Sequence, residues 1–118
     1  MTDAGLFVGF GHPVRGRESE AVQLFEEAIS YYARLQEEHV IEGFESVFLE
    51  AHGGDLDGFI LLRGDSEKLA ALRVSDEFTR LSMRAALCIE SFGVVGASLG
   101  ERLRRQMAYY TEQIAAIA

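Results

Sequence analysis

The sequence predicts one α+β domain with a four-stranded antiparallel sheet, and three observations support this fold class. The chain has 118 residues, enough for one hydrophobic core and too few for two ordinary domains. Apolar residues make up 48% of the chain and charged residues 25%, which is typical of a folded globular protein. Segments with the two-residue period of strands alternate with segments that have the period of helices.

The first strand is predicted at residues 6–10, an apolar run that Gly11 and Pro13 end. A helix is expected from Ser19, which is a plausible N-cap because its hydroxyl can accept a bond from a free backbone N–H group. Apolar residues then recur at the three- and four-residue spacings of a helix face, at Val22, Phe25, Ile29 and Tyr32.

A hairpin is predicted next. Residues 44–51 alternate as a strand does, residues 53–58 (Gly-Gly-Asp-Leu-Asp-Gly) are rich in turn formers, and residues 59–63 form a second apolar strand. In the alternation, Phe44, Ser46, Phe48 and Glu50 share one side of their strand.

The second half repeats the change from helix to strand. Ser66 is the expected cap of a helical region, and Val74-Ser75-Asp76 offers a second start signal, so two helical pieces are expected. Residues 92–97 are a fourth strand with two glycines. Beyond Gly100, apolar residues at spacings of four, three, four and three predict an amphipathic terminal helix, at Leu103, Met107, Tyr110, Ile114 and Ile117.

The order β-α-β-β-α-β with an added C-terminal helix is that of ferredoxin-like domains, and it spans residues 1–118 as a single domain. In such a fold the helices cover one face of the antiparallel sheet, and the other face meets water, a ligand or a second sheet. We expect Phe44 and Phe48 on this open face, with Phe7 or Phe10 and Phe59 or Ile60 nearby. That face is too apolar for water, which predicts a homodimer through the open sheet faces.

With this order and these residues, the chain resembles the dimeric α+β barrel superfamily, in which two ferredoxin-like subunits pack sheet against sheet around a cavity. Residues 9–17 (Gly-Phe-Gly-His-Pro-Val-Arg-Gly-Arg) and 50–54 (Glu-Ala-His-Gly-Gly) resemble an uncharacterised bacterial branch near the antibiotic-biosynthesis-monooxygenase-like proteins. The resemblance implies a cavity between the paired sheets. It does not extend to the haem-degrading branch, because the chain contains no Asn and no Trp.

Composition argues against several other functions. The formal charge of −8 disfavours nucleic acid and anionic membrane surfaces as partners. The single cysteine, Cys88, excludes an intramolecular disulfide. The chain shows neither a secretory signal nor an apolar run long enough to span a membrane, so the expected location is cytoplasmic. Gly9-Phe10-Gly11 lacks the third glycine of a dinucleotide-binding loop, and no cofactor is expected.

Glu50 and His52 are the candidate catalytic residues. If the strand at 44–51 continues through them, they share the face of Phe48, and the carboxylate can orient the imidazole for proton transfer beside an apolar cavity. The alternative places both at the rim of the hairpin, hydrogen-bonded to the turn.

His12, Arg15 and Arg17 follow the first strand and are candidate ligands for an anionic group near a helix N-terminus. In the alternative, Pro13 and Gly16 shape the turn and the arginines pair with surface acids. Arg63 ends the third predicted strand and is expected to approach Glu50 as a cavity ion pair or a plain cross-strand pair. Phe48 and Phe59 complete the candidate ligand-binding set. No metal site is expected, because His12, His52 and Glu50 come from the first and second strands, which are not adjacent in a ferredoxin-like sheet.

Two functions remain open at this point. In the first, the homodimer binds or transforms a small organic molecule in the cavity between its sheets. In the second, side chains fill the barrel and the domain is a non-catalytic interaction or structural module. A cavity beside His52 favours the first, and a packed interior favours the second.

Overall fold

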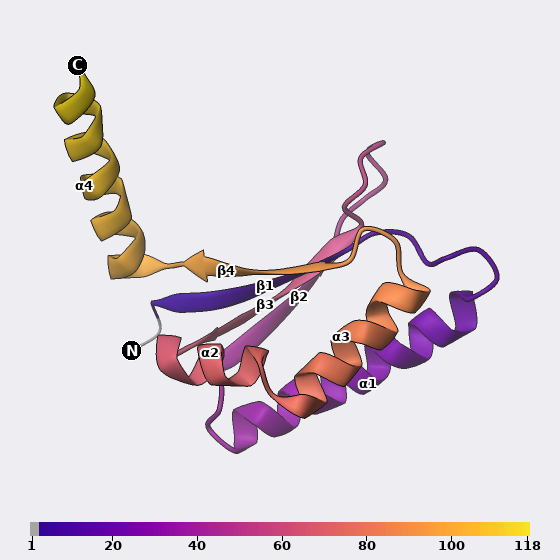
Figure 1. Cartoon of the computed structure of the whole chain (residues 1–118). Helices are drawn as coiled ribbons and strands as arrows, with labels where there is room; N and C mark the ends of the chain where they lie inside the picture. The colour runs from indigo at the N-terminus through magenta and orange to yellow at the C-terminus, as the bar shows by residue number, and fades with distance from the viewer. Residues whose placement is uncertain (1–2) are drawn as a thin grey trace.

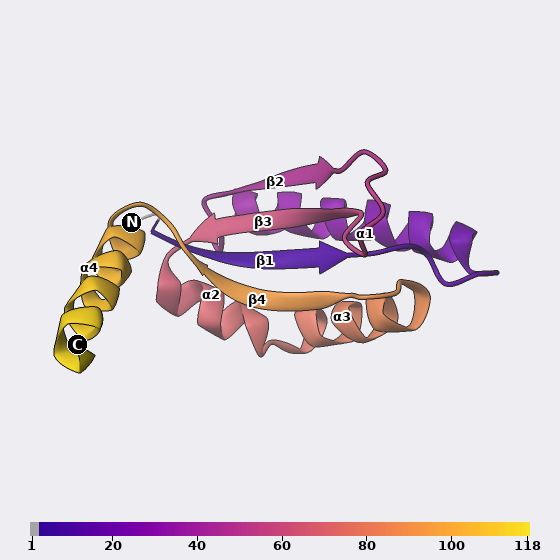
Figure 2. The same cartoon turned by 90° about the horizontal axis from the view of Figure 1, so that it is seen from above.

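The computed structural model describes residues 3–118, and their elements follow the predicted order. Four strands form one antiparallel sheet in the order β2-β3-β1-β4. Helices α1, α2 and α3 lie on one face of this sheet (Figure 1), and viewed from above the four strands run side by side over them (Figure 2). The elements are β1 Ala4–Phe10, α1 Glu18–Glu37, β2 Gly43–Phe48, β3 Gly58–Gly64, α2 Ser66–Arg73, α3 Asp76–Cys88, β4 Gly93–Ser98 and α4 Gly100–Ile117.

The central strands alternate strictly between the two faces of the sheet. Leu6 of β1 pairs with Leu62 of β3, and both lie under the helices, at 4% and 0% exposure. In the next register position, Phe7 pairs with Leu61, and both point to the opposite face and are only partly buried. The sheet therefore has one covered face and one open face, as the sequence predicts.

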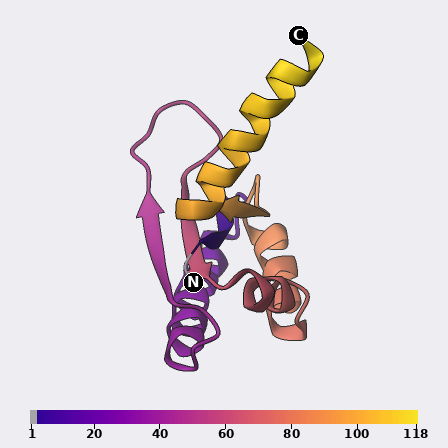
Figure 3. The same cartoon turned by 90° about the vertical axis from the view of Figure 1, so that its left-hand side faces the viewer.

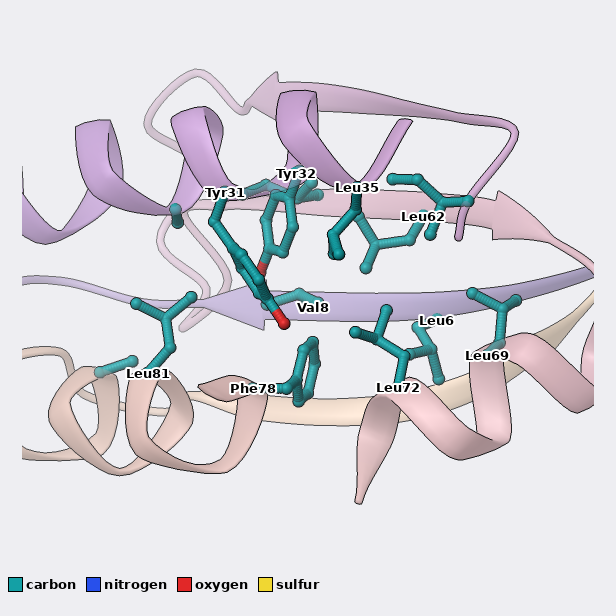
Figure 4. Packing of buried hydrophobic residues seen from close by; sticks show 14 of the residues in the cluster. Leu6, Val8, Tyr31, Tyr32, Leu35, Leu62, Leu69, Leu72, Phe78 and Leu81 are labelled. Carbon is teal, nitrogen blue, oxygen red and sulfur yellow. The ribbon is translucent and has the colours of Figure 1, made fainter. Parts of the chain in front are cut away.

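The core lies between the covered face and the helix layer. Figure 4 shows Tyr31, Tyr32 and Leu35 of α1 meeting Leu69 and Leu72 of α2 and Phe78 and Leu81 of α3 above Leu6, Val8 and Leu62. Burial of the Tyr32 phenol raises its pKa, because the charged form would lose its hydration. The amphipathic pattern of these helices thus serves to cover one sheet face.

The helix starts differ from the predicted caps. The α1 helix begins at Glu18, so Ser19 lies inside it, and the Glu18 carboxylate accepts a hydrogen bond from the Gly16 N–H group. At α2 the cap is Asp65, whose carboxylate accepts from the Lys68 N–H group at 3.1 Å, so Ser66 is the first helical residue. The predicted break before Asp76 is confirmed and separates α2 from α3.

The hairpin strand is shorter than predicted. The β2 strand ends at Phe48, and residues 49–57 form the loop that joins it to β3, although the Leu49 N–H group still bonds the Asp57 carbonyl at 2.7 Å in the register of the hairpin. Glu50 and His52 therefore lie on this β2–β3 loop and not on a strand. Their expected side-by-side placement on one strand face is wrong.

The terminal helix α4 stands apart from the rest of the domain. It leaves the end of β4 and rises on the side of the sheet opposite to α1, α2 and α3 (Figures 1 and 3). None of its residues is buried. Within residues 3–118, no helix is both long and apolar enough to cross a membrane.

Candidate functional site

The open sheet face is the candidate site, and its centre is aromatic. The rings of Phe7 and Phe59 stack with centroids 5.0 Å apart. Strand register places Leu61 and Val95 on either side of Phe7 on the same face, and Val95 is 56% exposed. An apolar surface therefore extends across three adjacent strands with no helix over it. Of the two alternatives Phe59 and Ile60, Phe59 lies on this surface and Ile60 is buried in the core.

Two paired glycines on this face differ in the space around them. At Gly9 the space of a side chain is already filled, since a Cβ there would lie 2.7 Å from the Phe7 ring and 3.3 Å from Leu56. Gly93 is its neighbour on β4, and a Cβ there would meet nothing within 4 Å. The open face is therefore filled by the Phe7 ring at Gly9, and it is exposed at Gly93 on the edge strand β4.

The polar groups of the open face are paired with each other. Arg63 of β3 donates a hydrogen bond to the Glu45 carboxylate of β2 at 3.1 Å, and both side chains are about half exposed. Arg63 thus forms a plain cross-strand pair, and its partner is Glu45 instead of the expected Glu50. This pair leaves no net charge at the edge of the apolar surface.

Phe48 does not belong to the open face. Its ring contacts Phe10 at 5.7 Å and Phe25 of α1 at 5.1 Å between centroids, on the side of the helices. Phe44 likewise packs on Tyr32 of α1, at 5.9 Å. The expectation that Phe44 and Phe48 point away from the helices is wrong, because Glu45 and Val47 take the open-face positions in the register with β3.

His52 is held by its own loop. Its Nε2 atom lies 2.8 Å from the Leu56 carbonyl oxygen, and its Nδ1 atom accepts a hydrogen bond from the Gly54 N–H group at 3.2 Å. A neutral imidazole with its proton on Nε2 satisfies both contacts. His52 is therefore hydrogen-bonded to the turn, as in the alternative reading, while Glu50 on the same loop is exposed.

His12 meets an acid that the sequence reading did not pair with it. Its Nδ1 atom lies 2.7 Å from the Asp57 carboxylate, and the imidazole is 70% exposed. Backbone bonds fix both residues, because the His12 carbonyl accepts from the Glu90 N–H group and the Asp57 N–H group donates to the Phe10 carbonyl. The antiparallel register of β1 and β3, which ends at Phe10 and Gly58, is the signal that brings these residues together.

The other charged candidates stay separate. Arg15 and Arg17 are exposed, and within residues 3–118 they form neither an ion pair nor a hydrogen bond through their side chains. The described part of the chain contains no group of three His, Cys, Asp or Glu side chains that can hold a metal ion. Beneath the sheet, an apolar cavity of about 40 Å³ lined by Val8, Phe25 and Leu81 has room for little more than one water molecule.

Comparison with known proteins supports the fold. No protein-family model and no curated protein sequence matches this chain. Among solved structures, a dimeric ferredoxin-like protein of unknown function from Jannaschia sp. CCS1 is 15% identical, with a TM-score of 0.60 over 82% of this chain and 98% of that chain. A dimeric ferredoxin-like protein of unknown function from Bacteroides fragilis NCTC 9343 is 13% identical, with a TM-score of 0.57 over 81% and 96%.

A third similar structure has a described activity. SnoaB, a cofactor-independent oxygenase from Streptomyces nogalater, is 13% identical, with a TM-score of 0.53 over 84% of this chain and 95% of that chain. At these identities the likeness establishes the shared fold. The chain therefore has a ferredoxin-like fold followed by the helix α4.

Proposed function

We propose that this ferredoxin-like chain works as a homodimer whose two open sheet faces oppose each other, and that a small aromatic molecule binds between them. The observation that supports this most is the uncovered apolar face, where Phe7 and Phe59 stack and Leu61 and Val95 flank Phe7. A contiguous apolar surface of this kind is typical of an interaction site. Two of the similar structures are described as dimeric, which agrees with this proposal.

The chemistry of the face favours a neutral aromatic ligand. Rings prefer offset or edge contacts with other rings, and each copy contributes the Phe7 and Phe59 pair. The Glu45 and Arg63 charges already neutralise each other at 3.1 Å, and the chain as a whole has a formal charge of −8. An anionic ligand would therefore be repelled at long range, whereas a neutral one would not.

A proton acceptor for such a ligand lies at the loop end of the sheet. The Asp57 carboxylate contacts Nδ1 of His12, an arrangement that holds the proton on Nδ1 and leaves Nε2 free as a base. His52 has both ring nitrogens engaged by its loop, so we assign the proton transfer to His12. Glu50, His52, Arg15 and Arg17 are proposed as the polar rim at this end, where they would select the ligand.

Two matched variants test the dimer and the ligand together. Val95→Glu puts a charge on the open face, where Val95 is 56% exposed, while Val74→Glu puts the same charge on the turn between α2 and α3, where Val74 is 77% exposed. We expect light scattering to show a dimer for the wild type and for Val74→Glu, and a monomer for Val95→Glu. Titration with 1-naphthol, a neutral aromatic probe, should show binding only to the two dimers.

The outcomes separate the two functions considered from the sequence. A monomeric wild type, or a Val95→Glu protein that remains dimeric, contradicts pairing through the open faces. A dimer that does not bind 1-naphthol contradicts the ligand and favours an interaction module with a filled interface. The role of His12 predicts that its Nε2 atom accepts a hydrogen bond from the hydroxyl of the neutral probe, so His12→Gln should weaken 1-naphthol binding without weakening the dimer.

A further inference from the structure

The helix α4 displays an apolar stripe that no other element covers. The stripe consists of five residues, each about half exposed or more: Leu103, Met107, Tyr110, Ile114 and Ile117. Their exposed fractions range from 48% at Leu103 to 85% at Ile117. Among the described residues, an Arg105 to Asp3 ion pair at 3.7 Å and a hydrogen bond from the Leu99 N–H group to the Asp3 carbonyl join this region to the domain. Helices depend on packing of their apolar face for most of their stability, so this stripe needs a partner.

The spacing of the stripe indicates what kind of partner fits. The apolar residues of the stripe recur at intervals of four, three, four and three, or every 3.5 residues on average. This spacing gives a narrow seam typical of coiled coils, whereas a helix that packs on a sheet has a broader apolar face. Gln106 and Gln113 flank the seam on one side, and Arg104 and Thr111 flank it on the other. A seam of this width and spacing accommodates another helix with the same period.

We propose that α4 pairs in antiparallel orientation with α4 of a second copy of this chain, with Tyr110 at the two-fold axis. The seam is nearly symmetric about Tyr110, since an axis there sets Leu103 against Ile117 and Met107 against Ile114 of the other copy. Each apolar side chain then meets an apolar one. A two-fold interface needs this kind of self-complementary surface.

Charge selects the antiparallel orientation over the parallel one. Arg102, Arg104 and Arg105 lie together in the first turns of α4, so parallel helices would bring six arginines side by side. Antiparallel helices separate the two clusters and also set the helix dipoles in opposite directions. Like charges held close together would cost binding free energy, so the parallel pair is disfavoured.

The position of α4 is compatible with the proposed dimer. Leu99 leads into the helix from the open face, where its side chain lies 3.5 Å from the Cβ position of Gly5, and α4 then rises away from α1–α3 (Figures 1 and 3). If two copies face each other about an axis along the strands, their α4 helices lie at the same end and run in opposite directions. The inference rests on the proposed function for this placement alone.

Disulfide trapping tests the two-fold pairing directly. In a Cys88→Ser background, Tyr110→Cys places the only thiol of each copy at the predicted axis, and mild oxidation should give a covalent dimer as the main product. Glu112→Cys is the matched control, because residue 112 lies on the opposite side of the helix and should give little covalent dimer. Equal cross-linking of the two variants, or none for Tyr110→Cys, overturns the pairing.

A charge on the seam measures its contribution to assembly. Ile114→Glu should raise the dissociation constant of the dimer by at least about tenfold, and Ala108→Glu, away from the seam, should change it by less than about twofold. Comparison with Val95→Glu separates the two proposals. If Tyr110→Cys cross-links while Val95→Glu changes neither assembly nor 1-naphthol binding, the α4 pair is supported and the open-face dimer is contradicted. If Val95→Glu disrupts assembly and Ile114→Glu does not, the α4 pair is contradicted.

Discussion

The two faces of the sheet differ less in composition than in what covers them. On the covered face Leu6, Val8, Ile60 and Leu62 are all at most 4% exposed under the helices. On the other face Phe7, Phe59 and Leu61 occupy the alternate positions of the same strands and are only partly buried. Both faces are apolar, but one chain supplies helices for only one of them.

This difference shows that strand periodicity alone does not assign a face to the core. A period of two separates two sets of residues, and the set with a helix layer becomes the core. When both sets are apolar, the second set requires a further covering. In this protein the proposed covering is a second copy of the chain and the ligand between the two sheets.

The largest expected effect comes from shortening neighbouring leucines on opposite faces. Leu62→Ala should lower the free energy of unfolding by about 2–5 kcal/mol, because it opens a cavity where the side chain is fully buried. Leu61→Ala should cost clearly less in urea unfolding at low protein concentration, since Leu61 is only partly buried in one chain. Equal losses would contradict the assignment of one covered and one open face.

Glycines allow a second comparison of the faces. A Cβ at Gly58 would collide with the Val47 carbonyl oxygen and the Phe10 ring, so Gly58→Ala should cost about 1–3 kcal/mol. Gly93 faces open space, so Gly93→Ala should leave stability almost unchanged. Thermal unfolding of the two variants measures the contrast, and a large loss in Gly93→Ala would contradict the open space at this position.

The helix layer that covers one face depends on its caps. Asp65→Ala removes the acceptor of the Lys68 N–H group and should cost about 1 kcal/mol, while Asp65→Ser should retain most of the stability. Chemical denaturation of both variants provides the measurement. An unchanged midpoint for Asp65→Ala would contradict the capping role.

The smallest effect concerns the ion pair that joins α1 to α3. Arg84 donates two hydrogen bonds to Glu27, at 2.7 and 2.9 Å, and this holds the pKa of the carboxyl below its ordinary value of 4.5. Its small contribution is present above pH 4.5 and is lost as the pH falls through the lowered pKa. Urea midpoints of wild type and Glu27→Gln should therefore converge at acidic pH, and a constant difference would contradict the pairing.

The order and type of the elements were predictable because each has a local signal. The break at Val74-Ser75-Asp76 and the heptad-like spacing of residues 103–117 both appear in the structure where the sequence places them. The orientation of the 43–48 strand was not predictable in this way. Phe48 and Val47 are both apolar, and only the register with β3 and the contact of Phe48 with Phe25 decide which of them faces the helices.

The sequence predicted the general position of the candidate site, but it did not predict which side chains contact each other there. The sequence reading extends the strand through His52, but the strand ends at Phe48 and residues 49–57 form a loop. The pairing of His12 with Asp57 depends on where two distant strands end together, which local patterns do not encode. Exposure of the α4 stripe likewise depends on tertiary placement and not on the helix itself.

The junction between β4 and α4 has a consequence for how such chains can evolve. The core is complete by residue 99, and the helix begins at Gly100, whose φ of +50° suits glycine better than any other residue. Because α4 contributes no buried residue, a gene could gain or lose this segment in one event without disturbing the fold. Under the proposed pairing, that event would change how strongly two copies associate, so assembly and folding would be free to evolve separately.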